Sequence, residues 1–466
     1  MSTTLEYTDL GDIDKIHARL RATFASGKTL PLAYRRQQLL QLARLVQDNS
    51  LAMQEAIYKD YRKQPLEVAL SDTTPIVPAA LRAAENLDEW AKPEKPEVEE
   101  WRSSWDTTIY KVPKGVAVII SPWNFPYILS FGPLVGAIAA GCPAILKPSE
   151  LTPSVAALCA ELVSKYLDSD AYVVVNGAVA ETARLLELKF DHIFFTGSTK
   201  VGSIVATAAA KQLTPTTLEL GGKSPVFIDA ENTDIDLAAK RVLWGRQLNA
   251  GQICVSPDYV LVPRSNQGAF VAAIQRAYKQ FFPDGALASS STLTAVHPSA
   301  RERVKGLISS TKGDIVVGGQ ESEGRIEPTV VKNVEIFAPI MPIVPVDNID
   351  EAIKIIRSHG TPLVIHVFTE SAETRDKFLD QTRSGYLVLN DTFMELAVHE
   401  TPFGGLGESG FGSFTSKYGF DTFTHQRSYI NVPLAAEPFL SHRYPPYREE
   451  GYKFFAAGAS QKIPDN

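Results

Sequence analysis

The sequence predicts an α/β protein with two doubly wound domains and a small additional β segment. Three observations support this fold class. Short apolar strands alternate with helices from residue 116 to residue 195, a second alternating series begins near residue 224, and no repeat of 20–50 residues occurs. Such alternation is typical of parallel sheets that carry helices on both faces and bind ligands beyond the carboxyl ends of their strands.

The elements follow from local patterns. The first ninety residues have helical spacing, as at 35–46, and a Pro- and Glu-rich linker at 92–100 leads to a strand at 105–112. The first series then contains strand 116–120, helix 127–140, strand 144–146, helix 153–166, strand 172–175, helix 179–187 and strand 192–195. The second series contains helices 237–247, 268–281 and 352–359 and strands 259–262, 314–317, 363–368 and 386–389. The last sixty residues, rich in Gly, Phe, Tyr and Pro, are expected to form loops and extended segments.

The composition excludes several classes of protein. The 466 residues carry a net charge of −7, so no basic surface points to nucleic acid as a partner. Only three cysteines occur, without a C-x-x-C pair, which argues against a disulfide framework or a cysteine-based metal site and indicates a reducing, cytoplasmic compartment. No metal site is predicted.

One stretch, 115–146, lacks charged residues and is long enough to cross a membrane. Four prolines and three internal glycines divide it into pieces that each fit a different element of a globular fold. The sequence therefore predicts no integral membrane segment.

Three glycine patterns are candidates for phosphate binding. The stretch 405–410 matches G-x-G-x-x-G but neither follows a clear strand nor opens a helix, so we interpret it as a flexible loop. The stretch 222–224 (GKS) lacks the earlier glycine of a P-loop, because Thr217 occupies that position. Gly197 follows a strand directly and opens a helix with an apolar face. This turn either directs N–H groups at a pyrophosphate or simply carries a helix cap at Ser198 or Thr199.

The three cysteines have different settings. Cys142 lies between Gly141 and Pro143, and Cys159 falls on the apolar face of a helix, so both are expected to be buried small hydrophobes. Cys254 follows the small, flexible segment 249–253 between a helix and a strand. Local sequence alone leaves Cys254 equally compatible with a reactive thiol and an inert one.

The motifs LELGGKSP at 218–225 and GQIC at 251–254 resemble the signature pair of the aldehyde dehydrogenase superfamily. Further family motifs occur in the expected order: SPWNFP at 121–126, FTGST at 195–199, EIF at 335–337 and PFGG at 402–405. The similarity extends from about residue 10 to residue 447. CVSPDY at 254–259 and RYPPY at 443–447 resemble the class 3 and fatty aldehyde dehydrogenase branch, which implies a homodimer.

The resemblance implies a division into functional regions. Residues 1–96 and 115–220 would form an NAD-binding domain and residues 221–412 a catalytic domain. Residues 97–114 and 413–435 would form an oligomerisation segment, followed by a tail at 436–466.

It also implies NAD(P)-dependent oxidation of a small-molecule aldehyde to the acid. Cys254 would attack the aldehyde carbon, and Glu219 would act as base and activate water to hydrolyse the thioester. The side-chain amide of Asn124 and the N–H of Cys254 would stabilise the oxyanion.

By the same resemblance, ten residues bind the cofactor: Ser121, Trp123, Lys147, Glu150, Gly197, Ser198, Thr199, Gly202, Glu335 and Phe337. Lys147 and Glu150 would hold the adenosine ribose, and Glu335 and Phe337 would contact the nicotinamide end. The carboxylate of Glu150 favours NAD, since it repels the 2′-phosphate of NADP, although the branch sometimes accepts both.

Several positions depart from the branch pattern, namely Phe125, Ala338, Glu395, Phe414, Thr415 and Ser416. Most of them lie in regions expected near the substrate mouth and so concern the identity of the substrate, for which long-chain aliphatic, aromatic and pathway aldehydes all remain open. Three alternative functions also remain: a coenzyme A-acylating dehydrogenase, a non-catalytic protein that retains the fold, and a cysteine hydrolase without nucleotide.

Overall fold

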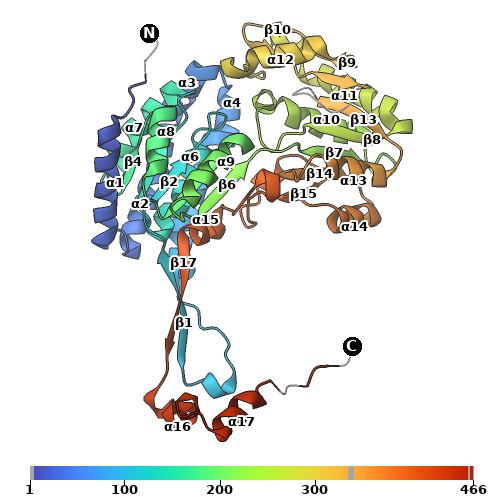
Figure 1. Cartoon of the computed structure of the whole chain (residues 1–466). Coiled ribbons are helices and arrows are strands. Elements are labelled where there is room, and N and C mark those ends of the chain that lie inside the picture. Colours follow the sequence, from blue (N-terminus) through green and yellow to red (C-terminus); the bar gives the residue numbers. More distant parts are fainter. Residues whose placement is uncertain (1–4, 334–340, 460–461, 465–466) are drawn as a thin grey trace. The chain divides into compact units, whose positions relative to one another are not determined.

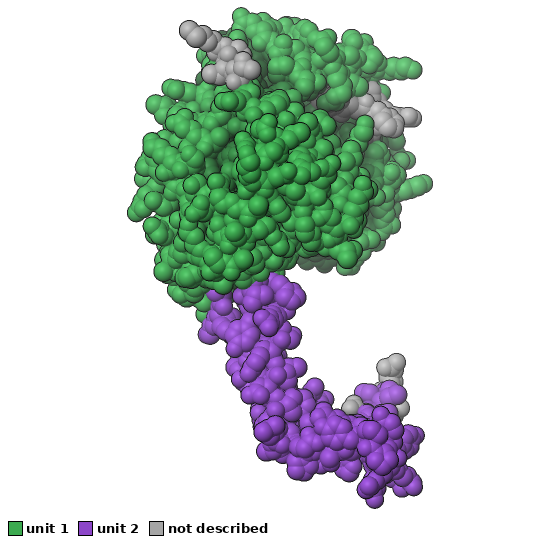
Figure 2. All heavy atoms as spheres, turned by 60° about the vertical axis from the view of Figure 1, so that its left-hand side comes forward, with its two compact units in different colours: residues 1–90, 113–424 green, residues 91–112, 425–466 purple. Residues whose placement is uncertain are grey.

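The computed structural model describes residues 5–333, 341–459 and 462–464. The chain divides into two compact units, one of residues 1–90 and 113–424 and one of residues 91–112 and 425–466 (Figure 2). Unit 1 contains the two main sheets and their helices (Figure 1).

The first main sheet has six strands in the order β16-β6-β5-β2-β3-β4. Five of them are parallel, and β16 runs antiparallel to β6. The strands are β2 (Ala117–Ile120), β3 (Ala144–Lys147), β4 (Tyr172–Val174), β5 (His192–Gly197), β6 (Thr216–Leu220) and β16 (Gly410–Phe411). The chain proceeds from β2 outward to β4 and then returns to β5 on the other side of β2, as the predicted doubly wound topology requires.

Alternation along these strands explains why helices cover both faces. Val118 and Ile120 of β2 pack in one apolar cluster with residues of α1, α8 and α9. Ile119 between them is also fully buried, so both faces of the strand are covered. The helices of this half are α1 (Leu10–Ala25), α2 (Leu32–Asp48), α3 (Ser50–Tyr61), α4 (Pro65–Val68), α5 (Ile76–Ala91), α6 (Ile128–Ala140), α7 (Pro153–Tyr166), α8 (Val179–Glu187), α9 (Thr199–Ala210) and α15 (Ser416–Phe423).

The second main sheet has seven strands in the order β15-β14-β7-β8-β13-β12-β9, with only β9 antiparallel to its neighbour. Its strands are β7 (Pro225–Ile228), β8 (Tyr259–Pro263), β9 (Asp314–Val317), β12 (Val330–Lys332), β13 (Met341–Val346), β14 (Val364–Phe368) and β15 (Tyr386–Leu389). A short hairpin pairs β10 (Glu321–Ser322) with β11 (Arg325–Ile326).

The same alternation divides the apolar core of the second sheet. Val226 and Val260 pack with α10 (Ile235–Gln247) and α11 (Gln267–Phe281). Phe227 and Leu261 point to the other face and pack with α13 (Ile349–Ser358) and α14 (Ala372–Gln381). A further helix, α12 (Pro298–Ser310), follows its N-cap residue His297. The predicted α/β fold class with two doubly wound sheets is confirmed.

Three features of unit 1 bear on the expectations from sequence. The uncharged stretch 115–146 forms β2, α6 and β3, and no helix among the described residues is long and apolar enough to cross a bilayer. Cys142 and Cys159 are fully buried, and burial raises the pKa of Cys142 to about 11. The glycine pattern 405–410 is a turn whose last residue, Gly410, begins β16 and pairs with β6. The turn is closely packed, since a Cβ on Gly410 would lie 1.9 Å from the Leu218 carbonyl oxygen.

Unit 2 contains a two-stranded ribbon of β1 (Asp106–Pro113) and β17 (Thr424–Asn431). It also contains α16 (Glu437–Leu440) and α17 (Glu449–Ala457), where the sequence suggested only loops and extended segments. Aromatic contacts account for the helices: the ring of Phe439 lies 5.6 Å from that of Trp101 and 4.8 Å from that of Phe454. Exposed large apolar side chains are frequent in this unit.

Candidate active site

The candidate site begins at the point where the first sheet reverses its strand order. β2 and β5 are neighbours, but the chain continues from β2 to β3 on one side and from β5 to β6 on the other. The loops after their carboxyl ends therefore diverge and leave a crevice. The loop after β2 carries Asn124, and β5 ends at Gly197, with Ser198 directly after it. This is the location that the fold class predicts for a ligand.

The nucleophile candidate approaches from the second sheet. After α10 the backbone makes a left-handed turn with φ of 48° at Asn249, 54° at Ala250 and 71° at Gly251. Left-handed backbone is unfavourable for a non-glycine residue, so surrounding contacts must hold this turn. Cys254 follows it and precedes β8, at the amino end of that strand, in contrast to the carboxyl-end rule.

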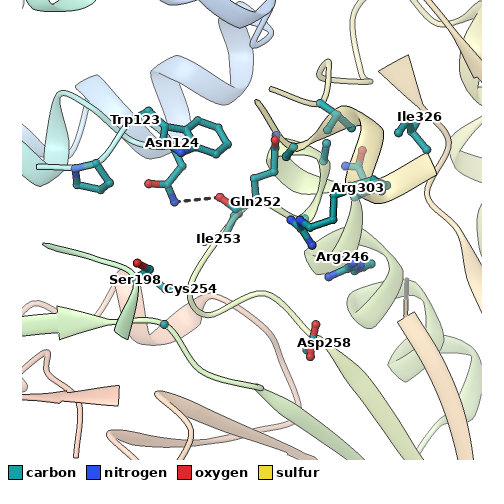
Figure 3. Close-up of a pocket in the computed structure, with 18 of the residues that line it drawn as sticks. Trp123, Asn124, Ser198, Arg246, Gln252, Ile253, Cys254, Asp258, Arg303 and Ile326 are labelled. Atoms are coloured by element: carbon teal, nitrogen blue, oxygen red, sulfur yellow. Dashed lines mark hydrogen bonds between the residues drawn. The ribbon is translucent and has the colours of Figure 1, made fainter. Parts of the chain in front are cut away.

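A cavity of about 510 Å³ joins these elements (Figure 3). Its lining includes all three predicted catalytic residues, Asn124, Glu219 and Cys254. Of the predicted cofactor residues, Trp123, Gly197 and Ser198 also line it. The structure thus brings together Asn124 and Cys254, which are separated by 130 positions in the sequence.

Asn124 is held at both its backbone and its side chain. Its side-chain Nδ2 donates to the main-chain oxygen of Gln252 at 2.9 Å (Figure 3). Its main-chain oxygen accepts from the Tyr61 hydroxyl at 2.9 Å, from Asn249 Nδ2 at 3.2 Å and from Lys63 Nζ at 3.4 Å. The amide is therefore fixed beside the segment that leads to Cys254.

Glu219 has a different environment. The residue is 3 % exposed, and neither carboxyl oxygen has a hydrogen-bond partner in the part of the chain that the structure describes. Burial raises the pKa of Glu219 well above its usual value. A carboxyl group of this kind is neutral over a wider pH range than a surface glutamate and becomes a stronger base once ionised.

The thiol of Cys254 is also shifted toward its neutral form. Burial, followed by the charges of Glu219 and then Glu395, raises the pKa of Cys254 to about 12. Ser224 Oγ donates to the Cys254 main-chain oxygen at 3.3 Å, and His366 Nε2 donates to the oxygen of Val255 at 3.1 Å. The backbone is thus fixed, while the thiol needs a proton acceptor before it can act as a nucleophile.

The turn after β5 can hold a phosphate group. Ser198 is the N-cap of α9 and accepts from Val201 N at 3.4 Å, and Thr199 donates to the Glu408 main-chain oxygen at 3.3 Å. A Cβ on Gly202 would lie 2.6 Å from Leu220, so this glycine permits close packing of α9 on β6. The helix cap at Ser198 is confirmed, and the pyrophosphate site stays a prediction that the N-terminus of the capped helix at the cavity allows.

Lys147 and Glu150 form an ion pair at the end of β3, with Nζ 3.0 Å from Glu150 Oε2. They do not line the cavity, but they lie where the strand ends, which suits a ribose-binding position. Ser121 is buried and its hydroxyl bonds to that of Ser130 at 2.6 Å. Trp123 packs against His297, with ring centroids 4.3 Å apart. Glu335, Phe337 and the departure at Ala338 lie outside the described residues.

The sequence assigned no role to Tyr61, Lys63 or Glu67. In the structure, Tyr61 and Lys63 donate to Asn124, and Glu67 accepts from Asn249. The sequence marks this segment only weakly, by the break between two helices before Pro65. Glu395, noted as a departure, is buried with both carboxyl oxygens unpaired among the described residues. Burial, the largest cause, raises the pKa of Glu395 to about 7.

Comparisons with known proteins agree with this arrangement. Residues 2–429 match the family described as the Aldehyde dehydrogenase family. The chain is 42% identical over 455 residues to the beta-apo-4'-carotenal oxygenase of Neurospora crassa, a match that covers 95% of this chain and 85% of that protein. It is 41% identical over 442 residues to aldehyde dehydrogenase family 3 member A2 of Rattus norvegicus, covering 92% and 91%.

Among solved structures, the substrate-bound AldH of Staphylococcus aureus matches with a TM-score of 0.92 and 35% identity, covering 96% of this chain and 99% of that one. The relatives confirm the resemblance to the class 3 branch. Since the family match spans most of the chain, this protein belongs to the aldehyde dehydrogenase family and is an NAD(P)-dependent oxidoreductase that oxidises an aldehyde.

Proposed function

We propose that the chain oxidises a long, mainly apolar aldehyde to its carboxylic acid through a thiohemiacetal and a thioester on Cys254. The observation that carries the mechanism is the shared cavity of Cys254, Glu219 and Asn124. Apolar side chains such as Leu129 and Ile253 in the lining, and the relative named for an apocarotenal, support the substrate class.

In the first step, Cys254 Sγ forms a bond to the aldehyde carbon, and the carbonyl oxygen becomes negatively charged. The Asn124 amide and the Cys254 N–H are the proposed donors to this oxygen. The thiol proton passes to Glu219, the unpaired carboxyl at the cavity. Both groups line the same cavity, and Glu219 is buried there.

The bound cofactor supplies the acceptor for the hydride that leaves the thiohemiacetal carbon. Glu219 releases the thiol proton to solvent and then takes a proton from water; hydroxide adds to the thioester carbon and the carbon–sulfur bond breaks. The leaving thiolate of Cys254 takes this proton back from Glu219, which restores the thiol and releases the acid. A carboxyl with a raised pKa suits this second role as general base, since it is a stronger base than an ordinary carboxylate once ionised.

For the cofactor, we propose the pyrophosphate at the N-terminus of α9, the adenosine ribose at Lys147 and Glu150, and the nicotinamide end against Glu335 and Phe337. Trp123, Ser121, Thr199 and the glycines 197 and 202 shape this site. The carboxylate of Glu150 supports a preference for NAD over NADP.

The mechanism is tested by the Cys254→Ala variant, for which we expect no NADH formation and unchanged NAD binding. Steady turnover in this variant would refute the covalent mechanism. Acid release by the wild type should not depend on coenzyme A; acyl-coenzyme A as the main product would instead support the acylating alternative.

The substrate class is tested by kcat/KM for linear aldehydes of increasing length, aromatic aldehydes and apocarotenals, each with NAD and NADP. We expect kcat/KM to rise with apolar length, since each buried CH₂ contributes about 0.8 kcal/mol. A maximum at short or charged aldehydes would contradict the proposed substrate.

We also propose a homodimer in the cytoplasm. A two-stranded ribbon such as β1 and β17 is marginal by itself, and Ile430 on β17 is 56 % exposed. The Ile430→Lys variant should yield monomers in light scattering, whereas Leu51→Lys, at a more exposed site on α3, should not. A reducing compartment keeps Cys254 able to attack.

A further inference from the structure

A short segment between α3 and α5 contains three charged side chains that the proposed chemistry does not use. Lys63 and Asp72 are completely buried, and Glu67 is 6 % exposed. Taking a charge out of water costs several kcal/mol unless partners compensate. The partners of these groups therefore indicate what the segment does.

The first partner is the backbone of Asn124. Its carbonyl oxygen accepts from Tyr61, Lys63 and Asn249, three donors directed at one acceptor. Lys63 Nζ also lies 3.5 Å from the ring centroid of Phe125, the next residue. Fixing this oxygen restricts the backbone torsion ψ of Asn124 and so the position from which the side chain extends, while the amide itself is held by its bond to the Gln252 oxygen.

The second partner is the start of α6, just beyond Asn124. Asp72 Oδ1 accepts from Tyr127 N at 3.1 Å and from Ile128 N at 2.9 Å. Its other oxygen lies 3.8 Å from Lys63 Nζ. The residues 124–128 are thus held by Lys63 at one end and by Asp72 at the other, and the two charges compensate each other.

Glu67 holds the opposite side of the site. Its Oε2 accepts from Asn249 N at 3.0 Å and from the Thr294 hydroxyl at 2.6 Å. The side chain of Asn249 in turn donates to the main-chain oxygens of both Asn124 and Gln252. One segment therefore contacts both the loop that carries the amide and the loop that leads to Cys254.

We propose that Tyr61 and Lys63 are positioning residues that hold the side-chain amide of Asn124 in place for the oxyanion. This proposal rests on the proposed role of Asn124. Donors to an oxyanion act through preorganisation, and displacement by about 1 Å can lower a rate about 10²-fold. Burial lowers the pKa of Lys63 to about 8, with Asp72 and Glu67 opposing the shift, so the ammonium form depends on this arrangement.

The test compares the single-turnover rate of NADH formation in four variants. Tyr61→Phe removes one donor to Asn124 but retains the ring, which contacts Trp123 and His297. Lys63→Met combined with Asp72→Asn removes both members of the buried ion pair, so that neither is left without the other, and Glu67 keeps its bonds to Asn249 N and the Thr294 hydroxyl. Asn124→Ala removes the amide itself, and Lys114→Met removes a half-buried lysine that donates to the Thr422 oxygen away from the cavity.

We expect Tyr61→Phe to lower the rate about 3- to 10-fold and the double variant about 10- to 100-fold, with unchanged NAD binding. In the Asn124→Ala background the same changes should have little further effect, because the group that they position is absent. Lys114→Met should retain the wild-type rate. A general structural role would instead give losses that multiply with that of Asn124→Ala.

Other outcomes would overturn either the positioning role or the proposed role of Asn124. Wild-type single-turnover rates in Tyr61→Phe, or losses that multiply with Asn124→Ala, would overturn the positioning role. If the double variant does not fold, Tyr61→Phe alone decides the question. A wild-type rate in Asn124→Ala would refute the proposed role of the amide, and the positioning proposal with it; this outcome is distinct from failure of positioning alone.

Discussion

The two sides of the catalytic cavity differ in how their polar groups are satisfied. On the Asn124 side, Lys63 and Glu67 are buried but contact named donors and acceptors. On the Cys254 side, both carboxyl oxygens of Glu219 lack a hydrogen-bond partner within the described residues. The side chains that hold the geometry on the Asn124 side each make at least one hydrogen bond, although Asp72 Oδ2 and Asn249 Oδ1 have no hydrogen-bond partner among the described residues. The carboxyl that must exchange protons makes none there, at a cost in stability.

The largest expected effect comes from removing the available carboxyl. Glu219→Gln keeps the shape but cannot accept a proton, so we expect kcat to fall about 10²- to 10⁴-fold. A single burst of NADH should remain if another group or water accepts the thiol proton in acylation. Stopped-flow absorbance separates the burst from steady turnover, and an unchanged kcat would exclude Glu219 as the base for hydrolysis.

A second prediction concerns the stability that Glu67 contributes on the Asn124 side of the cavity. Glu67→Leu leaves Asn249 N and the Thr294 hydroxyl without their acceptor, at about 1–3 kcal/mol for a buried unpaired group. Glu219→Gln removes no hydrogen bond of the described residues and should change the free energy of unfolding much less. Urea unfolding of the two variants measures the difference, and equal losses would contradict the contrast between the two sides.

A third prediction follows from the raised pKa of Glu219. The folded state retains this proton at pH values where the unfolded chain has lost it. The corresponding stabilisation is complete below the usual glutamate pKa and is lost as pH rises toward the folded-state pKa, with a slope of at most about 1.4 kcal/mol per pH unit. Urea unfolding should be measured at increasing pH from about 4, the ordinary carboxyl pKa. The free energy of unfolding should decline less with pH in Glu219→Gln than in the wild type.

The smallest expected effect lies in the left-handed turn before Cys254. Ala250→Gly relieves an unfavourable φ and should raise the free energy of unfolding by up to about 1 kcal/mol. The matched control Ala157→Gly, in the exposed part of α7, should lower it by about 1 kcal/mol. If Ala250→Gly also slows NADH formation, the strained turn contributes to the placement of Cys254; equal destabilisation by both variants would show that the turn is not strained.

Much of the fold was accessible from local pattern. Strand 314–317 and strand 386–389 match β9 and β15, and helix 179–187 matches α8, because apolar spacing and breaks by Gly or Pro act over a few residues. β6 and β13 were not predicted, since Glu219 interrupts the apolar run of one and Pro342 and Pro345 interrupt the other. The division at residue 221 into an NAD-binding and a catalytic domain stays a prediction.

Local sequence pattern predicts the candidate site to the same extent. The types of residue needed for aldehyde oxidation, and their motifs around Asn124, Glu219 and Cys254, were evident in the sequence. Their roles stay predictions, although all three line one cavity. The burial that shifts the pKa values of Glu219 and Cys254 could not be derived from neighbours in the chain.

The sequence by itself determined the family, the fold class and the chemistry that the motifs allow, because each is encoded in short runs of residues. Only the tertiary structure decided which side chains surround those motifs. Lys63 meets Asn124 across 61 positions, and Glu67 meets Asn249 across 182. Such contacts arise from the packing of sheets and helices whose order in space differs from their order in the chain, so no local pattern specifies them.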